Sequence, residues 1–122
     1  MAAICLGSIA ALFYHRLGLT LSHYDARGHL VVSRRIFDSL TPGWQQIGAV
    51  WLPLPHLLNM LPVQIDAFYR SGVSAVAISI LSFAIATTAI AWLVIIVTDS
   101  AWAGIAAAVV FAINPNVLYL QA

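Results

Sequence analysis

The chain has no lysine and no glutamate, and charge of either sign is scarce. Only 7% of its 122 residues are charged, all of them arginine or aspartate, whereas 62% are hydrophobic. A soluble domain carries roughly 25% charged residues. Because such an apolar composition does not supply a water-facing surface, we expect most of the surface to face lipid.

Two further scarcities exclude classes of function. The net charge is only +1, so the sequence predicts no basic surface and no nucleic-acid partner. Cys5 is the single cysteine and lies in an apolar run, which excludes an internal disulfide and a zinc knuckle.

Long apolar runs are the main positive feature. Residues 72–98 contain no ionisable side chain and exceed the ~20 residues that cross a bilayer, so they predict a transmembrane helix. After a very short turn, residues 101–120 predict a further span that continues through the sequence NPN, forming an antiparallel hairpin. Residues 1–21 predict a first span whose start lies upstream of Met1. A signal peptide is the alternative, but no basic residue precedes this run.

Small residues on the two later helices, Gly104 among them, favour close helix packing, although alanine and glycine are common in any membrane helix. Together the runs predict an all-α, multi-pass membrane helix bundle.

Polar residues concentrate in residues 22–71, between the first and second predicted spans. This segment holds four of the five arginines, three of the four aspartates and three of the four histidines. At 100° per residue, residues 24–40 place Arg34 and Asp38 on one arc and Leu30 and Leu40 on the opposite arc. The pattern predicts an amphipathic helix along the membrane interface, ended by the sequence TPG.

Prolines divide the second half of this segment. Pro55 is suited to begin a short helix, and Trp44 and Trp51 are typical of a headgroup-level aromatic belt. Asp66 and Arg70 predict an i,i+4 ion pair before the long span.

Asp25 allows two interpretations. Together with His29, four residues later, it projects toward the apolar side of the predicted helix, where a carboxylate would be buried or would line a cavity. Alternatively, Asp25 is the N-cap of that helix. A structural metal held by His23, Asp25, His29 and His56 is a minor alternative, because no local signature such as HExxH is present.

The motifs HYDARGHL, VWLPLPHLL and AINPNVLYLQ occur in an order that resembles the start of membrane glycosyltransferases of the C-type superfamily. These enzymes use polyprenyl- or dolichyl-phosphate sugars and include the protein mannosyltransferase and aminoarabinose transferase families. The resemblance covers nearly the whole chain. It implies that the chain is an N-terminal fragment of a many-helix membrane enzyme, inactive alone, whose first extracytoplasmic loop contains juxtamembrane helices and an essential acidic residue.

The resemblance implies specific roles. Asp25 matches the family's first-loop aspartate and would act as the base that accepts the proton of the acceptor hydroxyl. Ala26 follows it, whereas several relatives have an acidic pair. The implied partners are membrane lipid, a lipid-phosphate-linked sugar donor and an unidentified acceptor. The resemblance implies no definite cofactor, and a divalent metal that stabilises the departing phosphate is left open. Candidate substrate-binding residues are Arg27, His29, Arg34, Arg35 and His56. Anionic lipid headgroups are the alternative ligands of the arginines.

The expected location is the plasma or inner membrane, with residues 22–71 extracytoplasmic. The charge rule alone would place this arginine-rich segment in the cytoplasm, and we follow the resemblance. The competing hypotheses are a small non-enzymatic three-span assembly subunit and, third, a transporter fragment with Asp25 as its ion site.

Overall fold

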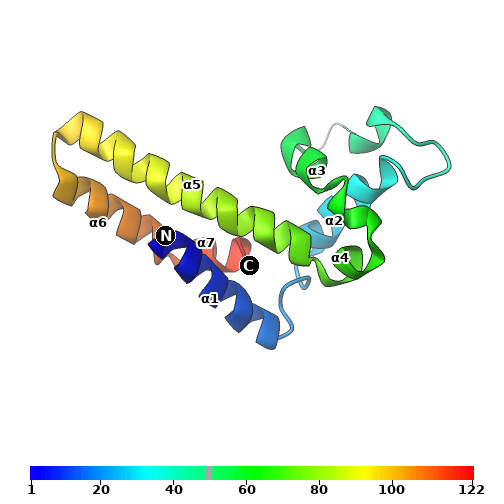
Figure 1. Cartoon of the computed structure of the whole chain (residues 1–122), viewed down its shortest axis with the longest axis horizontal. Helices are drawn as coiled ribbons and strands as arrows, with labels where there is room; N and C mark the ends of the chain where they lie inside the picture. Colours follow the sequence, from blue (N-terminus) through cyan, green and yellow to red (C-terminus); the bar gives the residue numbers. More distant parts are fainter. Residues whose placement is uncertain (49–50) are drawn as a thin grey trace. The chain divides into compact units, whose positions relative to one another are not determined.

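The computed structural model describes residues 1–48 and 51–122, and within these ranges every regular element is a helix (Figure 1). The predicted all-α class is therefore confirmed. Contacts divide the chain into two compact units: unit 1 comprises Met1–Leu17 and Ser79–Ala122, and unit 2 comprises Gly18–Ile78. The elements in chain order are α1 (Ala2–Arg16), α2 (Tyr24–Arg35), the 3₁₀ helix η1 (Trp44–Ile47), α3 (Pro53–Asn59), the 3₁₀ helix η2 (Pro62–Gln64), α4 (Asp66–Ser71), α5 (Val73–Thr98), α6 (Ala101–Ala112) and α7 (Pro115–Leu120).

Within the described residues, α5 is the one helix long and apolar enough to cross a membrane. At 1.5 Å per residue it rises roughly 39 Å, which exceeds the ~30 Å hydrocarbon core. Its outer side chains are exposed, as at Ile85 (70%) and Ile96 (68%). Helices α1 and α6 are also apolar but reach only roughly 22 and 18 Å. One span is thus supported by length and composition, and the multi-pass bundle stays a prediction.

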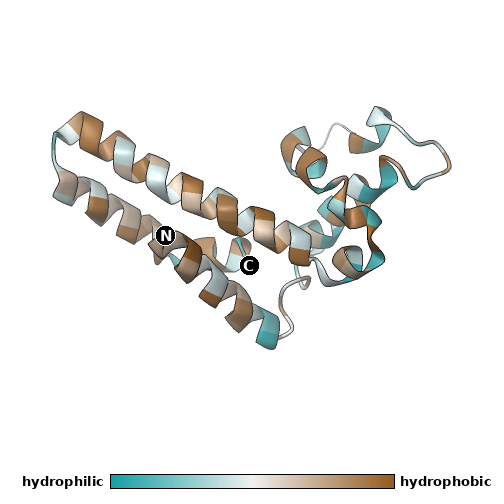
Figure 2. Ribbon diagram, in the orientation of Figure 1, coloured by the Kyte–Doolittle hydropathy of each residue, from teal (hydrophilic) through white to brown (hydrophobic). Residues whose placement is uncertain are grey.

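The helix expected over residues 101–120 is interrupted. Helix α6 ends at Ala112, and Asn114 caps a separate helix α7 by accepting a hydrogen bond from the Asn116 N–H at 3.0 Å. Pro115 is the cause, because proline has no N–H and its ring collides with the preceding turn of a continuous helix. The first helix likewise ends at Arg16 and not at residue 21, and its hydrophilic end is visible in Figure 2.

Close backbone approach holds α5 against α6 in unit 1. A Cβ added at Gly104 would lie 2.7 Å from the Ala91 carbonyl oxygen and would also overlap the side chain of Ile95. Only glycine permits this spacing, which is how helices associate without a hydrophobic driving force. Ser100 begins α6, its hydroxyl accepting the Ala103 N–H at 3.3 Å.

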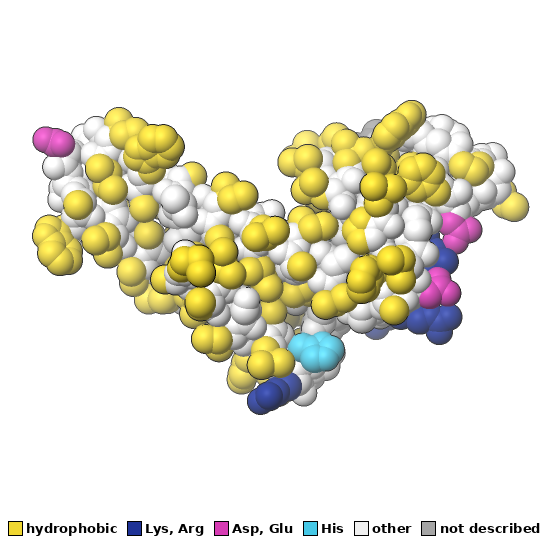
Figure 3. All heavy atoms as spheres, viewed as in Figure 1, with side chains coloured by type: hydrophobic (Ala, Val, Ile, Leu, Met, Phe, Trp, Pro, Cys, Tyr) yellow, Lys and Arg dark blue, Asp and Glu magenta, His cyan; other side chains and the backbone are white. Residues whose placement is uncertain are grey.

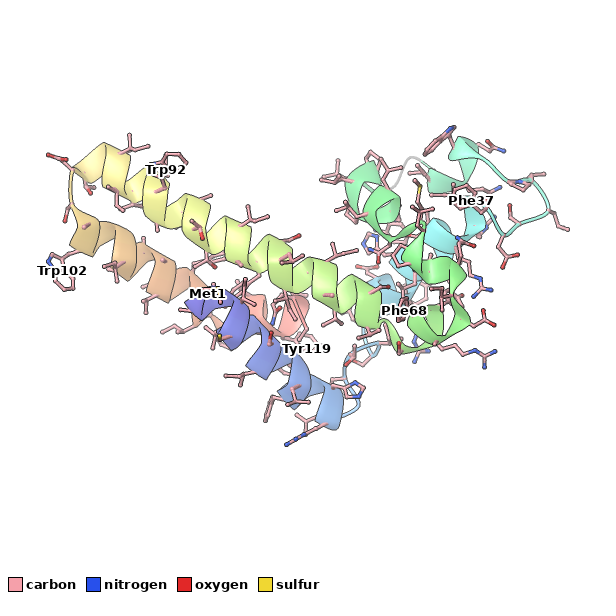
Figure 4. The ribbon with its side chains drawn as sticks, in the orientation of Figure 1. Met1, Phe37, Phe68, Trp92, Trp102 and Tyr119 are labelled. Atoms are coloured by element: carbon pink, nitrogen blue, oxygen red, sulfur yellow. The ribbon has the colours of Figure 1, made fainter. Side chains whose placement is uncertain are left out.

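A second set of contacts in unit 1 joins α1 to the end of the chain. The Gln121 side-chain amide donates to the Gly7 carbonyl at 3.1 Å, and the rings of Tyr14 and Tyr119 meet edge to face at 5.2 Å. Figure 4 shows Trp92 and Trp102 pointing outward near the α5–α6 turn, and both are mostly exposed.

Unit 2 is built around α2, which is shorter than predicted. The helix ends at Arg35, and the Gly43 N–H donates to the Ile36 carbonyl at 2.9 Å, which closes a loop that contains Leu40. Leu30 and Ile36 are buried as expected, but Leu40 is fully exposed because it lies beyond the helix. The predicted amphipathic helix is therefore correct only over its first three turns.

Proline and glycine position the later helices of unit 2. Helix α3 begins at Pro53, two residues before the predicted start at Pro55, and η2 begins at Pro62. Helix α4 ends at Ser71, and the next residue, Gly72, adopts the left-handed conformation (φ 71°), where a Cβ would lie 2.8 Å from a methyl carbon of Leu21. Gly72 therefore serves both as the stop of α4 and as a point of close approach.

Candidate functional site

Asp25 lies at the exposed start of α2. His23 is the N-cap, and its Nδ1 accepts the Asp25 N–H at 3.4 Å. The same Nδ1 is 3.9 Å from a carboxylate oxygen of Asp25, whose side chain is 55% exposed. His23 and not Asp25 is therefore the N-cap, and the Asp25 carboxylate is exposed and not buried on the apolar side as the sequence predicted. The helix begins at Tyr24, which places this carboxylate in the first turn, where the helix dipole favours negative charge.

Arg27 and Arg35 are the two candidate arginines on the exposed surface of α2. The Nε of Arg27 donates to the Leu21 carbonyl at 2.8 Å, which ties the side chain to the approach to the helix. The Arg35 side chain makes no hydrogen bond or ion pair within residues 1–48 and 51–122. Its guanidinium is therefore the freest donor set near α2 for an anionic ligand.

Arg34 has a different environment. Its Nε donates to Asp38 at 2.9 Å, its Nη1 donates to Asp66 at 2.6 Å, and its guanidinium carbon lies 4.6 Å from the centre of the Tyr69 ring. The Asp38 and Asp66 carboxylates raise the pKa of Arg34, and the guanidinium lowers the pKa of Asp66. Asp66 therefore pairs with Arg34 across two helices, not with Arg70 as predicted, and Arg70 acts on it only as a more distant charge.

His29 and His56 contact each other. Nδ1 of His29 on α2 lies 2.9 Å from Nε2 of His56 on α3, with the ring centres 4.9 Å apart. The structure thus brings together two of the candidate substrate-binding residues, with their ring nitrogens directed at each other. Their hydrogen bond requires one facing nitrogen to donate and the other to accept.

The two histidines are largely shielded from solvent, and the ring of Trp51 covers His29. His56 is fully buried, whereas His29 is half-buried beneath Trp51, whose ring centre is 4.8 Å away. The Trp51 ring also lies over Gly28, where an added Cβ would be 2.8 Å from the indole. Burial, followed by the charge of His29, lowers the pKa of His56, while the nearby Leu52 backbone acts weakly in the opposite direction.

Further buried polar groups surround this packing. Ser33 donates to the His29 carbonyl at 2.7 Å, and Asn59 donates to the Pro55 carbonyl at 2.9 Å. The Nδ1 of His56 is buried without a hydrogen bond of good geometry to any described residue, as is Oδ1 of Asn59. The interior of unit 2 thus combines buried polar side chains with apolar ones such as Leu30 and Val63.

The predicted metal ligands do not assemble. Within the described ranges no three histidine, cysteine or acidic side chains come together. His29 and His56 direct nitrogens at each other in hydrogen-bond geometry, and His23 faces Asp25. These donors do not fit a divalent metal, so no chemical step is assigned to one.

Charge and apolar surface are separated within unit 2. Residues 39–65 contain no Asp, Glu or Arg, and Leu54, Leu58 and Leu61 on or next to α3 are largely exposed. Figure 3 shows hydrophobic side chains over α3 and charged side chains gathered near α2 and α4. Such a surface has one side suited to the headgroup–acyl boundary and one side suited to water.

The sequence did not reveal the partners of the buried residues. Trp51 was assigned to a headgroup belt, yet it packs on His29 and Gly28. The usable signal was a glycine inside a helix one residue before a histidine, since such a glycine often marks close approach. Tyr69 beneath Arg34 had no equivalent signal.

Comparison with known proteins adds nothing to this description: no family model, no curated protein and no solved structure matches the chain.

Proposed function

We propose that this chain is the N-terminal part of an integral-membrane glycosyltransferase that moves a sugar from a polyprenyl-phosphate donor to a protein, lipid or glycan acceptor. The protein resides in the plasma or inner membrane as a multi-pass bundle, and residues 22–71 are extracytoplasmic. The resemblance of HYDARGHL, VWLPLPHLL and AINPNVLYLQ to the C-type superfamily supports this assignment. The long apolar helix α5 and the exposed apolar side chains of α3 are consistent with it.

The observation that carries the proposal is the exposed carboxylate of Asp25 in a unit whose surface is partly apolar. Sugar transfer requires a base for the acceptor hydroxyl. Asp25 takes that proton as the acceptor oxygen forms its bond to the anomeric carbon and the lipid phosphate departs with the electrons of the broken bond. Arg35, and Arg27 after release from the Leu21 carbonyl, are suited to the phosphate oxygens. Arg34 is suited to a structural role because two carboxylates already occupy it.

The direct test is Asp25→Asn in the natural full-length protein, with labelled sugar supplied on a polyprenyl phosphate. We expect transfer to fall by about 10²–10⁴-fold, the usual contribution of a general base. Asp99→Asn is the matched control, because Asp99 is also exposed and its φ of 51° is one that asparagine tolerates. Undiminished transfer by Asp25→Asn would remove this residue from the mechanism.

An assembly subunit without enzymatic activity is the second candidate. The exposed apolar side chains of α5 and α6, such as Leu93 and Val110, favour it, because they could contact other helices as well as lipid. Isolation of the natural protein in mild detergent would distinguish the two. A stable complex that lacks sugar transfer supports the subunit, and solute uptake into vesicles without transfer would instead support the transporter alternative.

A further inference from the structure

The pairing of His29 with His56 joins α2 to α3 through two imidazole rings. Their facing nitrogens are 2.9 Å apart, and His56 is completely buried. With both rings neutral, or with one ring protonated, one nitrogen donates and the other accepts. With both rings protonated, two N–H groups and two positive charges face each other and the hydrogen bond cannot form.

No counter-charge accompanies the pair. On α2 the nearest acidic side chain in sequence is Asp25, which faces His23, and on α4 Asp66 is bonded to Arg34. Helix α3, η1 and η2 contain no aspartate or arginine. In the described part of the chain no carboxylate lies within ion-pair distance of His29 or His56, so nothing offsets a second proton.

We propose that the His29–His56 hydrogen bond is an acid-sensitive latch that holds α2 against α3 and opens when both rings are protonated. Opening removes His56 from the interior and uncovers Trp51, whose ring rests on His29. The latch depends only on this geometry and is independent of the proposed sugar transfer.

The sign of the pH dependence follows from the burial of His56. Its pKa is lowered from the ordinary value of 6.5, chiefly by desolvation. A histidine with a lowered pKa in the folded state contributes stability above its unfolded pKa and loses it as the pH falls through the folded value. The latch is therefore closed at neutral pH and opens below pH 6.5.

The test uses the full chain in detergent micelles with Trp51 as its single tryptophan, after Trp44, Trp92 and Trp102 are replaced by phenylalanine. As the pH falls from about 8 to about 5, the emission of Trp51 should shift reversibly to the red. The variant His29→Asn with His56→Gln should show no shift. Each new side-chain amide reaches the position of the histidine nitrogen that it replaces, Nδ1 of His29 or Nε2 of His56. One amide can donate a hydrogen bond through its nitrogen, and the other can turn to accept it through its oxygen.

His23→Gln is the matched control, because His23 is the remaining histidine of unit 2, and it should retain the shift. A constant emission in the parent, or the same shift in the double variant, would overturn the latch. If the double variant does not fold, ring-labelled histidine NMR of the protein with Trp51 as its single tryptophan replaces it. His56 should then titrate below 6.5 together with the Trp51 change. Titration at or above that value, or independent of Trp51, would also overturn the latch.

Discussion

The two units of the chain are held together by opposite kinds of contact. In unit 1 the helices approach through residues with almost no side chain, such as Gly7 and Gly104. In unit 2 they are joined by directed polar contacts, with Arg34 between two carboxylates and His29 against His56. Steric substitutions should therefore damage unit 1 most, whereas charge, salt and pH should act mainly on unit 2.

The largest effect is expected for Gly104→Val. The added side chain would overlap Ile95 and the Ala91 carbonyl, which is backbone and cannot rotate away. We expect a loss of about 1–3 kcal/mol, typical of overpacking, measured by thermal unfolding in micelles. Ala106→Val on the exposed side of α6 is the control and should be nearly neutral. Equal stability of both variants would contradict the close α5–α6 contact.

The effect of Gly28→Ala on stability should change sign when the neighbouring Trp51 is removed. In the parent, the new methyl group meets the Trp51 ring at 2.8 Å, so we expect α2–α3 packing to loosen. In a Trp51→Ala background the clash is gone, and the same substitution should stabilise α2 by about 0.5–1 kcal/mol through helix propensity. A double-mutant cycle of unfolding measures this coupling. The same change in the free energy of unfolding in both backgrounds would show that Gly28 and Trp51 are not coupled.

Arg34→Gln should lower the melting temperature by a few degrees, and Arg35→Gln should leave it nearly unchanged. The first substitution removes both carboxylate contacts and the contact with Tyr69, while Arg35 makes no hydrogen bond or ion pair with any described residue. Because exposed ion pairs are screened, the difference should shrink in high salt. Melting curves at low and high salt provide the test, and identical curves for the two variants would refute the central role of Arg34.

A smaller effect is expected on the stability of the protein at low pH. Arg34 lowers the pKa of Asp66 below its ordinary value of 3.8. A carboxyl group whose pKa is lower in the folded state than in the unfolded state stabilises the fold. This stabilisation is complete above the unfolded-state pKa and is lost as the pH falls through the folded-state pKa. Unfolding of the parent should therefore become easier below pH 3.8, and Asp66→Asn should remove this part of the dependence. If Asp66→Asn leaves the pH dependence of unfolding unchanged, the Arg34–Asp66 pair contributes no measurable stability.

Much of the architecture was predictable because it depends on local chemistry. The uninterrupted apolar run gave α5, the short turn gave the α5–α6 hairpin, and the polar composition gave the separate segment between apolar helices. Errors occurred where one residue decides the outcome. Pro115 divides the last helix, and the turn after Ile36 leaves Leu40 outside the amphipathic helix.

The candidate site was harder to predict because its contacts are distant in sequence. Periodicity placed Asp25 and His29 on one face, but the position of the helix start made Asp25 an exposed first-turn residue. The partners of His29 and Arg34 lie on α3 and α4, and no spacing rule within α2 identifies them. Spacing within a helix predicts neighbours on that helix only.

The account is tested most directly by the side of the membrane on which position 25 lies. With Cys5 replaced by serine, Asp25→Cys and, separately, Asp99→Cys would be exposed to a membrane-impermeant maleimide in intact cells and after permeabilisation. In the proposed topology α5, which lies between positions 25 and 99 in the sequence, crosses the membrane, so we predict that Cys at 25 reacts in intact cells and Cys at 99 reacts only after permeabilisation. Reaction of position 25 only after permeabilisation, or at neither stage, would contradict an Asp25 carboxylate placed at the extracytoplasmic boundary.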